Sequence, residues 1–155
     1  RGERGPGDND QRHVLTLSGT FAAPPSKSPV LIKRALNGFQ IGYIFRYGSP
    51  LPFNILTGND RNFDTNVNDR PIGVRRNTGI GFNFMTFDLR LSRSLRLTER
   101  VRLEALVEGF NVLNRANFQL PNNVFGTGTL ALPSFGRPTA AADPRQIQFG
   151  LRLGF

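Results

Sequence analysis

The stretch RQIQFGLRLGF, residues 145–155, decides the fold class of this chain. From residue 147 onward every second residue is apolar, and the residues between them are polar or glycine. The apolar positions are Ile147, Phe149, Leu151, Leu153 and Phe155. Because alternate side chains of a β-strand point to opposite faces, this strand has one apolar and one polar face. A strand of about 9–11 residues with this pattern suits a transmembrane β-barrel, although the edge strand of a soluble sandwich also alternates.

The same stretch resembles the C-terminal signal of bacterial outer-membrane proteins. That signal has a polar residue, a glycine two residues later, a hydrophobic residue and a terminal aromatic residue. Gln148, Gly150, Leu153 and Phe155 occupy these places. The resemblance implies that the barrel-assembly machinery reads these four residues, and it favours the membrane barrel over the soluble sandwich.

The composition narrows the classes further. The 155 residues are enough for one domain, and the 17 glycines and 11 prolines favour turns over long helices. There is no cysteine, so disulfides and thiol chemistry are excluded. No run of about 18 apolar residues could form a transmembrane helix. The first ten residues lack the apolar core of a signal peptide.

The net charge of +9 is compatible with either nucleic acid or anionic lipid headgroups as partners. The arginines and lysines are scattered along the chain, without a basic helix or a dense run of lysine. We therefore expect no nucleic-acid partner. Outer-membrane lipid and lipopolysaccharide are the expected partners.

Alternation with a period of two recurs through most of the chain. It predicts an all-β fold, an antiparallel meander of about five strands that forms the C-terminal part of a large transmembrane β-barrel. The expected strands cover approximately residues 12–22, 35–56, 84–97, 101–112 and 145–155. Five strands are too few to close a membrane barrel, which needs about eight or more. The chain is therefore expected to be a piece of a larger barrel or a subunit that donates strands to a shared one.

Counted back from the C-terminus, the connections between these strands are long, short, long and medium, and the last of these, the proline-rich connector, is longer than a usual periplasmic turn. Outer-membrane barrels have short periplasmic turns and long extracellular loops. The loops at about 58–83 and 116–143 are accordingly predicted to be extracellular, together with residues 1–10. The turn 98–100 and the connector 23–30 are predicted to be periplasmic.

The three-residue turn 98–100 also predicts the register of the hairpin. Same-face pairing across it needs residue numbers that add to an even value, here 198. Leu97 should then face Val101, Leu95 should face Leu103, and Arg90 should face Glu108. Two residues do not fit the alternation: Arg93 falls on the apolar face, and Leu106 falls on the polar face.

Asp60, Asn62 and Asp64 stand at every second position of one loop, a spacing found in calcium-binding loops. Such a loop needs glycine where Thr65 stands and a bidentate glutamate where Pro71 stands. The alternative interpretation is a loop of turns in which Asn and Asp side chains bond the backbone. Apart from this possible Ca²⁺ site, no cofactor is expected.

No enzyme is expected either. His13 is the only histidine, and no partners for a catalytic triad can be nominated. Glu104 and Glu108 share a strand face at about 13 Å, too far apart for paired-carboxylate glycosidase chemistry.

Four phrases of the sequence resemble the C-terminal end of TonB-dependent outer-membrane receptors, in particular their Oar-like branch. They are GNDRNFDTNVNDRP (58–71), FDLRLSRSLRL (87–97), EGFNVLNRANF (108–118) and DPRQIQFGLRLGF (143–155). The most specific element is the combination of Phe110, Asn111 and Asn114 with the NDRP loop. The resemblance implies a barrel of about 22 strands in the bacterial outer membrane, with an N-terminal plug. It also implies import of a nutrient or larger ligand, driven by the TonB complex.

This chain lacks the plug and the TonB box of that family, so it would contact the TonB complex only through a missing N-terminal part. The alternative function is a structural or binding β-module without transport activity. Such a module would be a subunit of an oligomeric barrel or a soluble basic β-domain. A plug-like domain encoded upstream, preceded by a signal peptide, would support the receptor.

Overall fold

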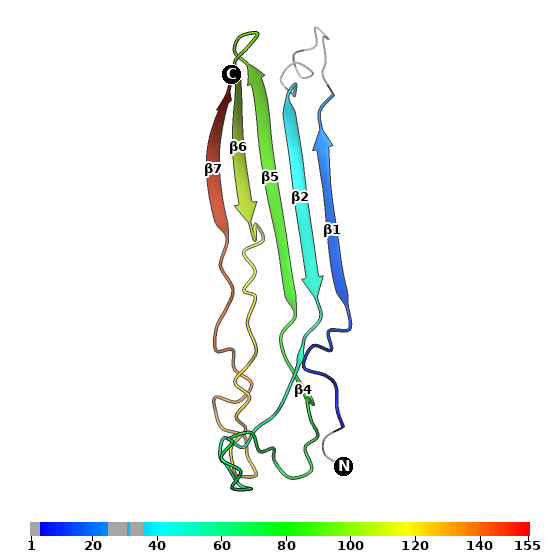
Figure 1. Cartoon of the computed structure of the whole chain (residues 1–155), viewed down its shortest axis with the longest axis vertical. Coiled ribbons are helices and arrows are strands. Elements are labelled where there is room, and N and C mark those ends of the chain that lie inside the picture. Colours follow the sequence, from blue (N-terminus) through cyan, green and yellow to red (C-terminus); the bar gives the residue numbers. More distant parts are fainter. Residues whose placement is uncertain (1–3, 25–30, 32–35) are drawn as a thin grey trace. The chain divides into compact units, whose positions relative to one another are not determined.

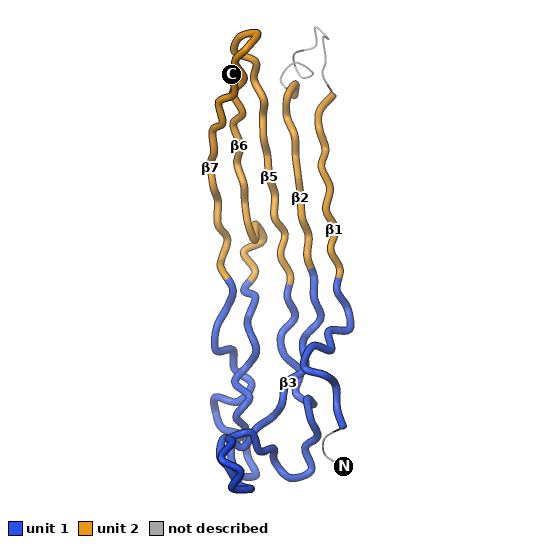
Figure 2. The backbone as a smooth tube through the Cα atoms, viewed as in Figure 1, with its two compact units in different colours: residues 1–14, 47–84, 116–142 blue, residues 15–46, 85–115, 143–155 orange. Residues whose placement is uncertain are grey.

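The computed structural model describes residues 4–24, 31 and 36–155, and this part of the chain is built of β-strands. The strands are β1 (Val14–Ala22), β2 (Phe39–Gly48), β3 (Pro52–Phe53), β4 (Gly79–Ile80), β5 (Phe84–Arg96), β6 (Arg102–Phe110) and β7 (Gln146–Gly154). Among the described residues, no helix is both long and apolar enough to cross a membrane. The chain divides into two compact units, which Figure 2 distinguishes by colour. Unit 1 contains residues 1–14, 47–84 and 116–142, and unit 2 contains residues 15–46, 85–115 and 143–155.

Unit 2 is built on a five-stranded sheet with the strand order β1-β2-β5-β6-β7. Figure 1 shows that successive strands run in opposite directions, so the sheet is an antiparallel meander. The predicted fold class, an all-β meander of five strands, is therefore confirmed. The alternation of apolar with polar residues explains this fold, because each strand is amphipathic in the way that a two-faced sheet requires.

The second of the expected strands is interrupted. A single strand was expected over residues 35–56, but β2 ends at Gly48, and residue 35 lies outside the described residues. Pro52–Phe53 instead pair antiparallel with Gly79–Ile80 in a separate two-stranded sheet. The physical reason is Pro50 and Pro52, which have no backbone N–H to donate to a continuing ladder.

The register of the β5–β6 hairpin is the predicted one. Leu95 is paired with Leu103 and Arg90 with Glu108, so the residue numbers add to 198. At the turn, the backbone N–H of Leu97 donates a hydrogen bond of 3.0 Å to the carbonyl of Val101. The next strand continues the same pattern, since Leu103 faces Leu153 across β6 and β7.

Strands β1 and β2 also pair so that odd-numbered residues lie opposite odd-numbered residues and even opposite even. The backbone N–H of Ala23 bonds the carbonyl of Phe39 at 2.9 Å, and that of Ser94 bonds the carbonyl of Gly38 at 2.9 Å. In each pair both residue numbers are odd or both are even, so odd-numbered side chains of all five strands share one face. Ring contacts on that face agree: Tyr43 on β2 stacks on Phe21 of β1, with ring centroids 6.1 Å apart.

The odd-numbered face is apolar and uncovered. Phe149 is 81% exposed and Leu151 77% exposed, and their neighbours on β5 and β6 are half-buried or exposed as well. Among the described residues, Phe53 of unit 1 is the only buried hydrophobic side chain. Within the described residues, this face therefore does not pack into a closed interior. A continuous exposed apolar surface of this kind marks contact with a membrane or another protein.

Unit 1 brings together three segments that are far apart in the sequence. The side-chain amide of Asn77 donates to the carbonyl of Pro6 at 2.8 Å and to Asp8 Oδ1 at 2.6 Å. The backbone of Leu56 bonds Asn123 at 2.9 Å and Phe125 at 2.8 Å. The N-terminal segment and the two long loops thus belong to one structural unit. The lengths of the connections predict that these same three segments are extracellular.

Candidate functional site

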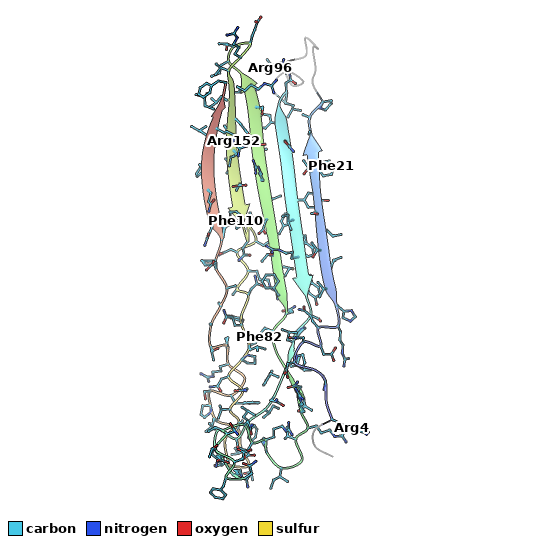
Figure 3. The ribbon with its side chains drawn as sticks, viewed as in Figure 1. Arg4, Phe21, Phe82, Arg96, Phe110 and Arg152 are labelled. Carbon is cyan, nitrogen blue, oxygen red and sulfur yellow. The ribbon has the colours of Figure 1, made fainter. Side chains whose placement is uncertain are left out.

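The even-numbered face of the unit 2 sheet carries the candidate functional site, a network of ion pairs across strands. Arg90 on β5 pairs with Glu108 (Nη1–Oε1, 3.3 Å) and with Glu104 (Nη2–Oε1, 3.5 Å), both on β6. Arg152 on β7, labelled in Figure 3, reaches Glu104 at 3.8 Å. Because these side chains are partly solvated, each pair contributes only a few tenths of a kcal/mol, roughly. The predicted pairing of Arg90 with Glu108 is confirmed.

Asp88 connects this face to the end of strand β6. Its Oδ2 accepts a hydrogen bond from Arg46 Nη2 at 2.9 Å, and its Oδ1 accepts the backbone N–H of Asn111 at 2.9 Å. The Asp88 side chain is only 13% exposed, so its two oxygens need these donors. Asp88 therefore ties strand β2 to the turn that follows β6.

That turn is built by Asn111, which is 4% exposed. Its Nδ2 donates to the carbonyls of Arg115 at 2.9 Å and Asp143 at 3.3 Å, and its Oδ1 accepts the N–H of Arg115 at 3.1 Å. Asn114 adds a bond of 3.1 Å from the N–H of Arg145 to its Oδ1. Both asparagines have left-handed backbone conformations, with φ of 47° and 51°. Asparagine tolerates this conformation better than most residues, which explains why β6 ends at Phe110 and not at residue 112 as expected.

A depression of about 440 Å³ opens on unit 2, and its lining includes the charged side chains of Asp88, Arg90 and Glu108. Gly42 forms part of its floor, and a smaller depression of about 260 Å³ shares Gly42 and Arg90 with it. Hydroxyl groups, charges of both signs and the exposed ring of Phe110 therefore meet on this surface. The depression thus combines polar and charged groups with the apolar side chains of Ile44, Leu89 and Phe110.

The two residues that break the alternation both have a local explanation. Arg93 lies on the apolar face, where its guanidinium stands 4.7 Å from the centroid of the Phe39 ring. This is a cation–π contact, and it lies three residues before the end of β5. Leu106 lies on the polar face directly opposite Gly150, and the missing side chain of Gly150 makes room for it.

The four residues of the C-terminal signal lie on or directly after β7. Gln148 and Gly150 belong to the polar face, opposite Glu108 and Leu106. Leu153 lies on the apolar face, and Phe155 follows the end of β7 with 94% of its surface exposed. Recognition of these residues by the assembly machinery stays a prediction.

Asp60, Asn62 and Asp64 lie in a loop of unit 1 that bonds its own backbone. Asp60 Oδ2 accepts the N–H of Thr65 at 2.8 Å, and Asp64 Oδ1 accepts the N–H of Asn66 at 2.8 Å. The Asn66 N–H and the Asn62 amide hold the pKa of Asp64 below its ordinary value. In the part of the chain that the structure describes, no group of three or more His, Asp or Glu side chains is placed to hold a metal ion. The geometry is that of an Asx-turn loop, and calcium binding stays a prediction.

Comparison with known families identifies the class of the sheet. Residues 72–148 match the family model described as an outer membrane beta barrel domain. No curated protein and no solved structure gives a match. The matched segment begins before β4 and ends within β7, so it contains β5 and β6 in full. The chain thus carries an outer-membrane β-barrel segment. In such a barrel the apolar face contacts lipid and the polar face lines the interior.

Proposed function

We propose that the chain is part of the barrel wall and extracellular loops of a TonB-dependent receptor of the bacterial outer membrane, one of the Oar-like branch. In this role it binds and helps to import a nutrient or a larger ligand, and it catalyses no reaction. The polar face with its Arg90 network lines the lumen, and the odd-numbered face contacts lipid. The loops that contain residues 58–83 and 116–143 face the outside of the cell.

The observation that carries this proposal is the two-faced sheet, whose strands β5 and β6 lie in a segment that matches an outer-membrane β-barrel domain. Two edges, β1 and β7, end the sheet, and an unpaired edge in lipid is prohibitively costly. Further strands must therefore complete the barrel. The resemblance of four phrases, among them the Asn111–Asn114 turn, to the Oar-like branch supports the choice of receptor.

The partners of this function follow from the same proposal. Outer-membrane lipid and lipopolysaccharide surround the apolar face, and the barrel-assembly machinery acts on the C-terminal strand. The TonB complex acts through a part of the receptor that precedes this chain. No nucleic acid is involved.

The experiment compares the product of the complete open reading frame with residues 1–155 alone. Both carry the same affinity tag, and binding to the purified periplasmic domain of TonB is measured by surface plasmon resonance. The complete product should contain a plug-like domain of about 100–150 residues and should bind TonB, whereas residues 1–155 should not. The shorter chain is the matched control, because it has the same barrel strands without the TonB-contacting part.

Two results would contradict the receptor. One is a complete product with no domain ahead of Arg1. The other is a complete product that does not bind TonB. An oligomer of residues 1–155 that resists sodium dodecyl sulfate would favour the alternative, a subunit of a shared barrel.

A further inference from the structure

The end of the β5–β6 hairpin concentrates positive charge. Arg93, Arg96, Arg100 and Arg102 lie within ten residues, and Glu99 is the only acidic residue among them. Arg96, labelled in Figure 3, is the direct cross-strand partner of Arg102. Like charges directly opposite each other on neighbouring strands repel, so this pair is unfavourable without an anion. Among the described residues, no carboxylate forms an ion pair with any of the four guanidinium groups.

Arg93 also lacks an anionic partner, and it lies on the apolar face of the sheet. It lies on the apolar face beside Phe39, and its Nε is buried without a hydrogen-bond partner in the described chain. A buried donor without an acceptor is unfavourable, and more so when the group is charged. The described chain therefore offers Arg93 no anionic partner, and its half-buried side chain lies on the face that the proposed function places toward lipid.

We infer that the β5–β6 hairpin end binds the headgroup phosphate of an anionic phospholipid. Arg93 makes the contact on the lipid side, since guanidinium groups bond phosphate oxygens with good geometry. Arg96 and Arg102 lie on the polar face and act through their electric field, which salt screens over about 8 Å at physiological ionic strength. The inference rests on the proposed membrane placement, in which this turn lies at the periplasmic rim beside phospholipid headgroups.

The test uses a tryptophan as a local reporter, because residues 1–155 contain none. Leu97→Trp places it in the hairpin, at an odd-numbered position that is 56% exposed. Any tryptophan elsewhere in the full-length protein is replaced by phenylalanine. The protein is reconstituted into phosphatidylcholine vesicles that contain either brominated phosphatidylglycerol or brominated phosphatidylcholine. Quenching by each brominated lipid gives the relative affinity of the hairpin for anionic and neutral headgroups.

The protein should prefer phosphatidylglycerol by roughly fivefold or more, a value expected from one or more arginines near an anionic surface. Replacement of all four arginines by glutamine (Arg93→Gln/Arg96→Gln/Arg100→Gln/Arg102→Gln) should reduce this preference to about one. The matched control Arg61→Gln/Arg75→Gln removes two loop charges of unit 1 and should leave the preference unchanged. Heat-modifiable mobility on a gel confirms that each variant is folded before it is measured.

Equal quenching by both lipids, or a preference that survives the quadruple substitution, would overturn the phosphate site while leaving the membrane placement intact. Absence of quenching by either lipid in folded protein would overturn the membrane placement of this hairpin as well. The two failures are therefore distinguishable in one experiment.

Discussion

Leu106 on β6 lies directly opposite Gly150 on β7, and a Cβ atom at position 150 would stand 3.0 Å from Leu106 Cδ1. The glycine of the C-terminal signal thus has a structural role in this chain, because it accommodates an apolar side chain on the polar face. Gly150→Ala should crowd Leu106 and destabilise the folded protein by about 1–2 kcal/mol. The free energy of unfolding, measured by urea titration of refolded protein in detergent, tests this.

Two further variants separate crowding from a general effect of losing a glycine. Gly154 is on the same strand and face, and a Cβ there would have nothing within 4 Å. Gly154→Ala should therefore be neutral or slightly stabilising. In the double variant Gly150→Ala/Leu106→Ala, the crowding should disappear, so the two changes should not add. Equal effects of Gly150→Ala and Gly154→Ala would show that the contact with Leu106 is unimportant.

The Asn111 turn is expected to be a sensitive point of the fold. Asn111→Ala removes three side-chain hydrogen bonds and puts a less tolerant residue at a φ of 47°. We expect a loss of about 2–4 kcal/mol in the free energy of unfolding. Asn111→Gly keeps the backbone freedom and should recover about 1 kcal/mol relative to alanine. If alanine and glycine have equal effects, the left-handed conformation is not a source of the cost.

The loop around Asp64 should lose order in acid. Its pKa is lowered by the N–H of Asn66 and the amide of Asn62, so the ionised form is favoured in the folded loop. The contribution to stability is therefore present above the ordinary value near 3.8 and is lost as the pH falls through the lowered pKa. The amide resonance of Asn66, followed by NMR between pH 6 and about pH 2, should shift with a midpoint below that value. Asp64→Asn should abolish the shift, and a midpoint at or above the ordinary value would refute the assignment.

Deletion of Phe155 should impair assembly more than a substitution on the polar face of the same strand. By resemblance, Phe155 is the terminal residue that the assembly machinery reads, and an aromatic ring suits the membrane interface. The full-length protein is expressed with Phe155 deleted or with Arg152→Gln as the control. The folded fraction is then measured by heat-modifiable mobility of membrane extracts. Equal folded fractions in the two variants would show that the terminal aromatic is incidental.

The sheet could be predicted from the sequence because the patterns that specify it involve residues close together in the chain. Alternation assigns each residue of the hairpin to a face, and the short turn at 98–100 fixes the pairing of Arg90 with Glu108. Arg93 and Leu106 could be recognised as exceptions, but their partners could not. Phe39 lies 54 residues from Arg93 along the chain, and Gly150 lies 44 residues from Leu106. The register that brings each pair together depends on the whole sheet.

The Asn111 turn and the small sheet of β3 and β4 could not be predicted, because their contacts join residues that are far apart in the sequence. The hydrogen bonds of Asn111 extend to Asp88 and to Asp143, and no local sequence pattern predicts them. Strands β3 and β4 have two residues each, which is too short for a periodicity. Pro50 and Pro52 did indicate where β2 ends. The strand expected over residues 35–56 extended past them.

The central claim is that odd-numbered residues of the sheet face lipid and even-numbered residues face the barrel interior. Single cysteines at residues 146–154 of β7 can each carry a nitroxide spin label in the reconstituted full-length protein, because residues 1–155 contain no cysteine and any cysteine elsewhere in that protein is replaced by serine. Electron paramagnetic resonance then measures the accessibility of each label to oxygen, which concentrates in lipid, and to a water-soluble nickel complex. The account predicts high oxygen accessibility at odd positions such as Phe149 and Leu151, alternating with low values at Gln148 and Arg152. Accessibility that does not alternate, or that is highest for oxygen at the even positions, would contradict it.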